Sequence, residues 1–294
     1  MEGGVARTHS TYIMKSWIVF HMDSTVEAPC LLTLPAEIRT LILEYVFASG
    51  PSLHGDGFKN HGCPGGISLH DSYTATSNLA PLLTCRQFYA DANLYALSRT
   101  SFTASSLFCN VRSRLAVLHP TQIEALRSIA FVADARHFRD LLSWGPYAFG
   151  VPGLRLHTLT IVLYRSSYCH YLFDFTAVLV RFLRNLSGVQ KLVVVRNNAR
   201  VQGSFRTWYN RLVGLLLKVD HHERYECVPA RPEKTWWKWE YDAEAQSFCL
   251  EALPAKEEGV EEALYMEMMR PLIDQLVESM SVEDRHITYL TGAS

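Results

Sequence analysis

LHTLTIVLY, at residues 156–164, is the middle one of three short apolar segments that decide how the centre of this chain folds. The other two are LRSIAFVA at 126–133 and VQKLVVVR at 189–196. All three contain β-branched side chains, which favour the pleated backbone, and their apolar runs are nearly continuous, as in strands covered on both faces. The sequence therefore predicts a buried sheet.

The spacing of these segments indicates how they are connected. Aligning Ile129, Leu159 and Leu192 gives separations of 30 and 33 residues, enough for a strand, a turn, a helix and a return. Before Gly188, six apolar residues fall on one helical face: Phe175, Val178, Leu179, Phe182, Leu183 and Leu186. Right-handed crossovers of this kind produce parallel strands. We expect a leucine-rich-repeat-like parallel sheet, with an irregular α/β layer as the alternative.

Two aromatic-rich segments and a helix follow the predicted sheet. TWWKWEYD at 235–242 and QSFCLEAL at 246–253 are separated by a short polar link, which predicts a β-hairpin. Apolar residues recur at helical spacing over 257–280, and Pro271 predicts a kink or a break because proline lacks the backbone N–H of the helix ladder. We therefore expect residues 101–294 to form an α/β interaction region with a C-terminal hairpin and helix.

The N-terminal third is predicted to be helical. Residues 1–30 show no periodicity, and we expect them to form a loosely ordered arm. Two stretches with helical spacing, LPAEIRTLILEYVF at 34–47 and LLTCRQFYADANLYAL at 82–97, flank a segment at 49–78 that is rich in Gly, Ser, His and Pro. Residues 31–100 are therefore expected to form a helical module with a loop insertion, and the whole chain an α+β fold.

The two helical stretches resemble the F-box-like module of fungal proteins, over about the first third of the chain. The first half of the family pattern is matched by Leu34, Pro35, Glu37, Ile38 and Arg39. The second half is matched by Leu82, Leu83, Thr84, Cys85, Arg86, Gln87, Tyr89 and Ala92. The two halves in this order are more specific than either half alone. The 49–78 segment departs from the pattern, because it separates helices that lie close together in a compact F-box.

This resemblance implies a protein-interaction adaptor that is not itself catalytic. F-box modules dock on the Skp subunit of cullin-based ubiquitin ligases, while the rest of the chain captures a protein substrate. The docking face here would consist of Leu34, Pro35, Ile38 and Ile42, seated in a groove of the partner. Core packing would explain the same apolar face. The alternative is therefore a scaffold or interaction protein with no ligase link, whose F-box-like helices are fused into one core.

The charges of the chain are unevenly distributed. Its 294 residues include 28 Lys and Arg and 29 Asp and Glu, yet residues 175–219 contain eight basic and no acidic residues, and 220–294 contain 17 acidic and seven basic residues. We favour the interpretation that these segments neutralise one another within the fold. Candidate contacts to an acidic protein substrate lie in the basic segment and on the hairpin: Arg196, Arg200, Arg206, Arg211 and Trp237.

The same basic segment could suit a nucleic acid, because its arginines are interleaved with Phe205, Trp208 and Tyr209. Core positions for Phe205 and Trp208 would remove both rings from base stacking, and the net charge of −1 supplies no supporting field. Nucleic-acid binding is therefore only the third choice.

Enzyme and cofactor motifs are missing from the sequence. It contains no G-x-S-x-G elbow, no G-x-x-x-x-G-K-[ST] phosphate loop and no G-x-G-x-x-G turn. His54, His61, Cys63 and His70 offer metal donors within one segment, but their spacing fits no common zinc pattern. We expect no catalytic activity, no cofactor and no metal.

The sequence also favours a cytoplasmic or nuclear protein. Its apolar runs are shorter than the roughly 20 residues that cross a bilayer, so we expect no membrane partner. The seven cysteines are scattered and form no C-x-x-C pair, which predicts reduced thiols rather than a disulfide framework.

Overall fold

The computed structural model describes residues 31–47, 57–62, 65–257 and 259–291. The helices are α1 Ala36–Val46, α2 Ala75–Leu79, α3 Arg86–Arg99, α4 Val111–Leu115, α5 Pro120–Ala125, α6 Ala135–Asp140, α7 Thr176–Asn185, α8 Phe205–His221 and α9 Glu262–Thr291. The strands are β1 Phe58–Asn60, β2 Ile67–Leu69, β3 Ser101–Ala104, β4 Ser128–Ala133, β5 Leu156–Leu163, β6 Val189–Val195, β7 Thr235–Asp242 and β8 Ser247–Pro254. The predicted arm at 1–30 lies outside the described residues.

One six-stranded sheet forms the centre of the molecule, in the order β3-β4-β5-β6-β8-β7. The first four strands are parallel, and β8 runs antiparallel to both β6 and β7. Ile129 pairs with Leu159, and Leu159 pairs with Leu192, so the alignment made from sequence spacing matches the register. The expected α+β class, parallel strands and C-terminal hairpin are confirmed. Strand β3 was not expected.

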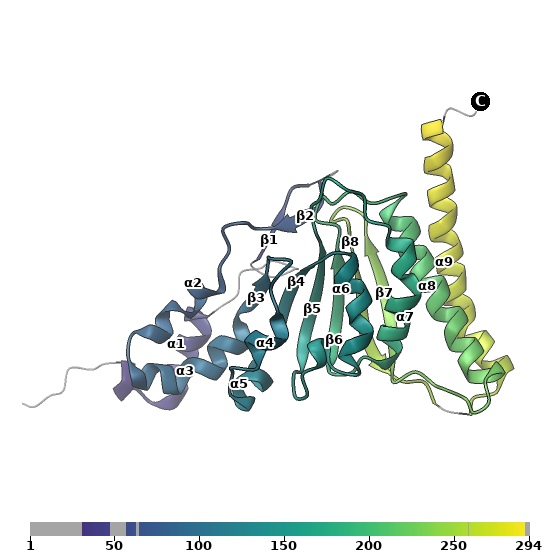
Figure 1. The fold of residues 1–294 in the computed structure, drawn as a ribbon. Helices are drawn as coiled ribbons and strands as arrows, with labels where there is room; N and C mark the ends of the chain where they lie inside the picture. The colour runs from purple at the N-terminus through teal and green to yellow at the C-terminus, as the bar shows by residue number, and fades with distance from the viewer. Residues whose placement is uncertain (1–30, 48–56, 63–64, 258, 292–294) are drawn as a thin grey trace, which may run out of the picture.

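The main core lies between the sheet and the helices α6, α7 and α8, which cover one face of it (Figure 1). Alternate strand residues such as Leu159, Ile161 and Leu163 point into this core, since successive side chains of a strand face opposite sides. Serine and aspartate caps begin two of the covering helices. The Ser204 hydroxyl accepts backbone N–H groups at the start of α8, and the Asp134 carboxylate does so at α6.

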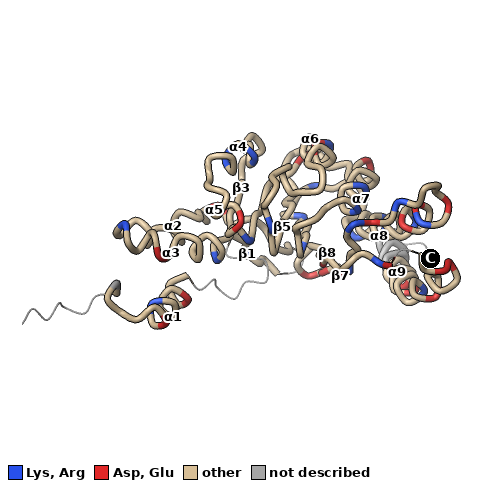
Figure 2. Tube along the Cα trace, turned by 90° about the horizontal axis from the view of Figure 1, so that it is seen from below, with Lys and Arg blue, Asp and Glu red and all other residues tan. Residues whose placement is uncertain are grey.

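The opposite face of the sheet is covered by the hairpin of β1 and β2, so the prediction of a plain loop over 49–78 is wrong at these two strands and at the start of α2. Ile67 packs against Val193 and Val195, and Leu69 packs against Val162 and other small residues of the sheet. Figure 2 shows β1 on the side of the sheet opposite to α6 and α7. Residues 49–56 and 63–64 of the predicted loop lie outside the described residues.

Glycine is required where this hairpin meets the sheet. Gly66 has φ +66°, and a Cβ there would lie 2.6 Å from the Ala245 carbonyl oxygen. That carbonyl accepts the Ile67 N–H at 2.9 Å. The close approach of the two backbones therefore depends on the absence of a side chain.

The N-terminal module has a small core of its own. Helix α1 packs on α3 through Leu43 and Phe47, which contact a cluster that includes Phe88 and Ala92. The second predicted helical stretch is interrupted in the structure: Cys85 is extended, with φ −159°, and its Sγ caps α3 by accepting the Phe88 N–H. The segment before it forms α2 and a short 3-10 helix, Ala80–Leu83.

Helix α9 is continuous through Pro271, so of the predicted kink or break the break is absent. Its apolar face lies on α8, where Leu276 approaches Gly214, and Tyr265 and Met269 are buried. Packing on α8 holds the helix together across the position where proline removes one hydrogen bond. None of the described helices is long and apolar enough to cross a membrane.

Candidate functional site

The most exposed apolar surface of the N-terminal module lies on α1. The side chains of Ile38, Leu41 and Tyr45 are 44%, 60% and 87% exposed, and they are spaced so that they share one side of the helix. We call these three residues the α1 face. A monomeric protein seldom leaves several neighbouring large apolar side chains in water without a binding partner.

The four residues predicted to bind the partner lie at or beside the α1 face. Pro35 and Ile38 are exposed, whereas Leu34 and Ile42 are half-buried. The opposite side of the helix carries Leu43 and Phe47 into the small core. None of the four predicted contact residues belongs to the main core between the sheet and its covering helices.

Two further contacts fix how α1 sits on α3. Arg39 Nη1 donates to Asp91 Oδ2 at 3.0 Å, which joins the two helices by an ion pair. The Phe47 and Tyr95 rings meet edge to face at 6.4 Å. The second motif also leaves apolar groups exposed, namely Leu83, which is 83% exposed, and Tyr89.

The four candidate arginines do not converge on one patch. Arg196 donates to the Gln246 side chain, and Arg200 donates to the Ser167 carbonyl. On α8, Arg206 lies over the Tyr241 ring and Arg211 over the Phe173 ring. Residues five apart on a helix point in different directions, so these two guanidinium groups diverge.

The prediction for Trp237 is wrong, because its side chain is 1% exposed and its indole N–H donates to the Leu183 carbonyl at 3.0 Å. Phe205 and Trp208 are also buried, and the Trp208 indole donates to Thr176 Oγ1. These rings are core residues and cannot stack on bases. Figure 2 shows basic and acidic residues intermixed around α8 and α9.

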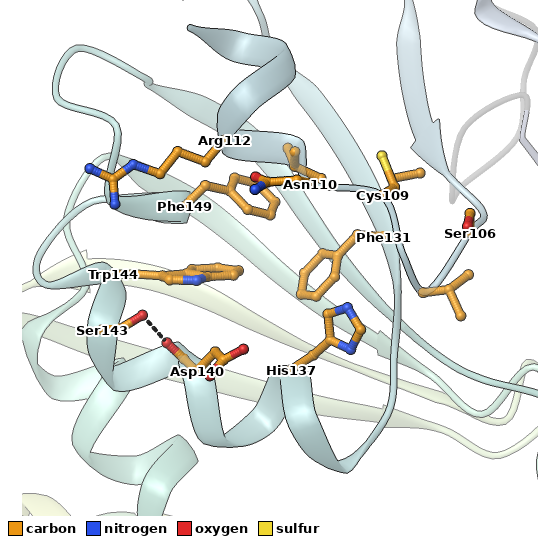
Figure 3. Close-up of a pocket in the computed structure, with 13 residues that line it drawn as sticks. Ser106, Cys109, Asn110, Arg112, Phe131, His137, Asp140, Ser143, Trp144 and Phe149 are labelled. Carbon is orange, nitrogen blue, oxygen red and sulfur yellow. Dashed lines mark hydrogen bonds between the residues drawn. The ribbon is translucent and has the colours of Figure 1, made fainter.

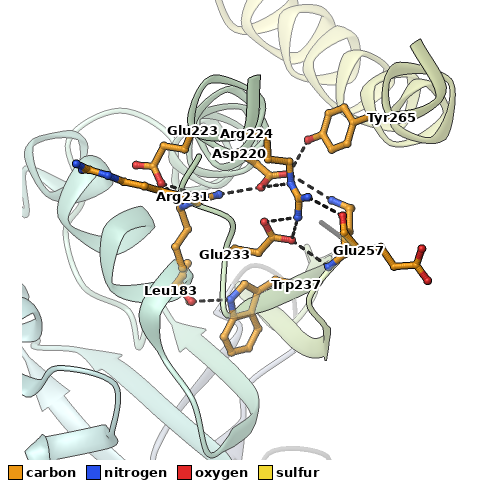
Figure 4. A network of polar contacts seen from close by, with 11 residues as sticks. Leu183, Asp220, Glu223, Arg224, Arg231, Glu233, Trp237, Glu257 and Tyr265 are labelled. Carbon is orange, nitrogen blue, oxygen red and sulfur yellow. Dashed lines mark hydrogen bonds and ion pairs between the residues drawn. The ribbon is translucent and has the colours of Figure 1, made fainter. Parts of the chain in front are cut away.

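A buried cluster of charges joins α7, α8, α9 and the start of β7 (Figure 4). Asp220 lies at its centre, fully buried, and its Oδ1 accepts from Arg184 Nη1 at 2.9 Å and from Arg224 Nε at 3.2 Å. Its Oδ2 accepts from the Tyr265 hydroxyl at 2.6 Å and lies 3.5 Å from Lys256 Nζ. Asp220 thus receives hydrogen bonds from several helices.

Two glutamates, Glu233 and Glu223, complete this cluster by pairing with its arginines. Both carboxylate oxygens of Glu233 accept from Arg224 Nη2 at 2.6 Å, and Arg184 also pairs with Glu223 at 3.0 Å. Arg184 belongs to the basic segment and its two acidic partners to the acidic one. The prediction that the two segments neutralise each other is therefore confirmed at Arg184.

The environment shifts the pKa values of this cluster in opposite directions. Burial raises the pKa of Asp220, but hydrogen bonds with Glu233 and Tyr265 and the charge of Lys256 lower it more, so it stays below its usual range. Burial and the neighbouring Asp220 raise the pKa of Glu233. Burial lowers the pKa of Lys256 to about 8, although both carboxylates oppose that shift.

The lowered pKa of Lys256 predicts a pH dependence of stability. Above about pH 8 the folded chain releases a proton that the unfolded chain keeps until about pH 10.4, so this residue's contribution to the free energy of unfolding rises with pH. We expect the stability of the wild type relative to Lys256→Met to increase between about pH 7 and about pH 9.5 in urea unfolding. A difference that stays constant or decreases would contradict the assignment.

The predicted metal donors that can be placed are engaged in hydrogen bonds. His61 Nε2 lies 2.6 Å from Ser68 Oγ, and His70 Nε2 lies 2.7 Å from the Tyr164 carbonyl. Within the described ranges, no group of three His, Cys, Asp or Glu side chains is placed to hold a metal ion. His54 and Cys63 lie outside those ranges.

Sequence reasoning missed a cavity of about 320 Å³ at the carboxyl ends of β3 and β4. Its lining comes from the segment after β3, from β4, from α6 and from the 3-10 helices Leu141–Trp144 and Ala148–Gly150. The available signal was the row of polar residues directly after the LRSIAFVA segment at 126–133, which includes His137 and Asp140.

Comparisons of this chain with protein-family models, with curated proteins and with solved structures find no match.

Proposed function

We propose that the chain is an F-box-like adaptor whose α1 face docks on a Skp-type subunit of a ubiquitin ligase. The observation that carries the proposal is the exposure of Ile38, Leu41 and Tyr45 on the helix that bears the family motif. A helix with an apolar face can bind in a groove of a partner through anchors at such spacings. In this role the chain is not itself catalytic and acts in the cytoplasm or nucleus.

The rest of the chain, residues 101–294, is the region that captures a protein substrate in this proposal. We interpret its four parallel strands as a leucine-rich-repeat-like sheet, on which the substrate is held near the ligase. The second candidate is a scaffold without a ligase link. The placement of α1 favours the adaptor, because its buried residues Leu43 and Phe47 belong to the small core, whereas the main core is reached only by α2 and α3, through Leu79 and Leu97.

Binding of the purified full chain to a recombinant Skp-type subunit tests this proposal. We expect stable binding, and we expect Ile38→Asp to weaken it at least about tenfold, because burying an isoleucine contributes about 1.5–3 kcal/mol. Thr40→Asp is the matched control, since it adds the same charge at an exposed position of α1 outside the α1 face. Unchanged thermal unfolding must accompany both variants.

Two results would overturn the adaptor role. One is the absence of binding by the wild type, which leaves the scaffold as the better account. The other is equal binding by Ile38→Asp and the wild type, which would place the contact somewhere other than the α1 face.

A further inference from the structure

The cavity at the carboxyl ends of β3 and β4 has an aromatic floor. Phe131 from β4 meets Phe149 at 5.4 Å and Trp144 at 5.6 Å between ring centroids, and Trp144 and Phe149 lie 4.4 Å apart. Ligands of open sheets with parallel strands commonly bind beyond the carboxyl ends of those strands. The cavity therefore combines this position with an apolar surface made of three aromatic rings.

The backbone under this floor adopts a conformation that side chains rarely take. Phe149 has φ +56°, within the left-handed region, and its ring is buried against Trp144. Non-glycine residues in this region are concentrated at binding and active sites, because the surrounding structure must hold them there. The backbone conformation of Phe149 therefore also favours a binding site at this position.

The rim of the cavity has two chemically different sides (Figure 3). Arg112 and Asn110 lie on one side and are donors. Asn110 Oδ1 accepts the Ser113 N–H, which leaves its amide NH₂ for a ligand. In the described part of the chain, no hydrogen bond or ion pair holds the Arg112 guanidinium, so this side offers a cation and an amide donor.

The other side of the rim belongs to α6 and carries acceptors. His137 and Asp140 are three residues apart and hence neighbours on the helix surface. His137 Nδ1 lies 2.8 Å from Asp134 Oδ1 and accepts the Asp134 backbone N–H at 3.3 Å, so this nitrogen is engaged with the N-cap of α6. No described residue donates to the Asp140 carboxylate.

Asp134 stays ionised behind His137. Burial raises the pKa of Asp134, but hydrogen bonds from Arg136 and His137 lower it more, to well below its usual range. The α6 side therefore presents the Asp140 carboxylate to the cavity, with the His137 imidazole beside it.

We propose that this cavity binds a small aromatic zwitterion. The ligand's ring lies on the floor of Phe131 and Trp144, its ammonium group pairs with Asp140, and its carboxylate pairs with Arg112 and Asn110. The volume is at the lower end of the range of about 300–1,000 Å³ for ligand pockets, so it suits a compound with one ring. This site does not depend on the α1 face or on the adaptor role.

Titration of the full-length protein with three related probes, followed by NMR, tests the proposal. The probes are 4-(aminomethyl)benzoate, benzylamine, which lacks the carboxylate, and benzoate, which lacks the amine. We expect the zwitterion to bind at least about tenfold more tightly than either control, because each end adds a charge-assisted hydrogen bond. The indole signal of Trp144 should shift on binding.

Two substitutions separate the two sides of the rim. Asp140→Asn should weaken the zwitterion and benzylamine about tenfold without affecting benzoate, and Arg112→Gln should weaken the zwitterion and benzoate without affecting benzylamine. Both side chains are exposed, so thermal unfolding should stay unchanged. Arg114→Gln, on the same helix but outside the lining, is the matched control and should change nothing.

The proposal is overturned if the zwitterion does not bind, or if it binds no better than both controls. It is also overturned if both rim variants bind the zwitterion as the wild type does, because the contact would then lie elsewhere.

Discussion

Replacing Asp220 by alanine is expected to lower the free energy of unfolding by about 3–5 kcal/mol. The substitution removes the carboxylate that accepts from Arg184, Arg224 and Tyr265 in a fully buried position. Arg184 keeps Glu223 and Arg224 keeps Glu233, but the cluster loses one negative charge, and Lys256 lies beside the gap. A buried cation without its partner is costly because water cannot solvate it.

Urea unfolding followed by tryptophan fluorescence measures this loss, and two further variants give it a scale. Tyr265→Phe removes a single hydrogen bond to the same carboxylate and should cost about 0.5–1.5 kcal/mol. Asp274→Ala makes the same change as Asp220→Ala at an exposed site of α9 and should stay within about 0.5 kcal/mol of the wild type. A loss at Asp220 no larger than that at Tyr265 would show that the cluster tolerates the missing charge.

The strands of the sheet could be predicted from the sequence, because their apolar runs are long and their spacing is regular. The pairing of Ile129, Leu159 and Leu192 followed from alignment alone. Strand β3 could not be found in this way, since SFTA has four residues, two of them hydroxylated, and its pairing with β4 is a long-range contact.

The β1–β2 hairpin was missed for a compositional reason. Its surroundings are rich in glycine, serine and histidine, which are typical of loops, whereas its apolar contribution consists mainly of Phe58, Ile67 and Leu69. The hairpin's apolar residues pack against small apolar residues of the sheet, on the face opposite to the covering helices. Local patterns do not reveal such complementary pairs, which lie more than 100 positions apart in the case of Ile67 and Val193.

The candidate sites were predictable to different degrees. Helical spacing over 34–47 predicted an apolar face that includes Ile38, but it could not say whether the core or solvent lies beside that face. The rim of the cavity was beyond the reach of sequence patterns, because Arg112 and Asp140 come from separate helices that only the fold brings together.

Replacing Asn197 by alanine is expected to cost about 2–4 kcal/mol and to release the β1–β2 hairpin from the sheet. The buried Asn197 side chain joins the two: Oδ1 accepts the Leu69 N–H at 2.9 Å and Arg165 Nη2 at 3.1 Å, and Nδ2 donates to the Leu163 carbonyl at 2.9 Å. Alanine would leave the Leu69 N–H and the Leu163 carbonyl without these partners. Each unpaired buried group costs about 1–3 kcal/mol.

The neighbouring residue provides a control for the backbone. Asn197 and Asn198 both have positive φ, 54° and 57°, so alanine at either position meets the same strain. Asn198 is exposed, and no described side chain or backbone group is bonded to its amide. Asn198→Ala should therefore report the backbone cost alone, and the difference between the two variants isolates the hydrogen bonds of Asn197.

Native-state hydrogen exchange distinguishes release of the hairpin from general destabilisation. In Asn197→Ala the amides of Ile67 and Leu69 should lose protection by much more than those of β5, because the hairpin opens while the parallel strands keep their pairing and their helix-covered core. Equal loss of protection in β5 would mean that the hairpin and sheet unfold together. In that case the hairpin would be an integral layer of the fold instead of a separable cover on the far face of the sheet.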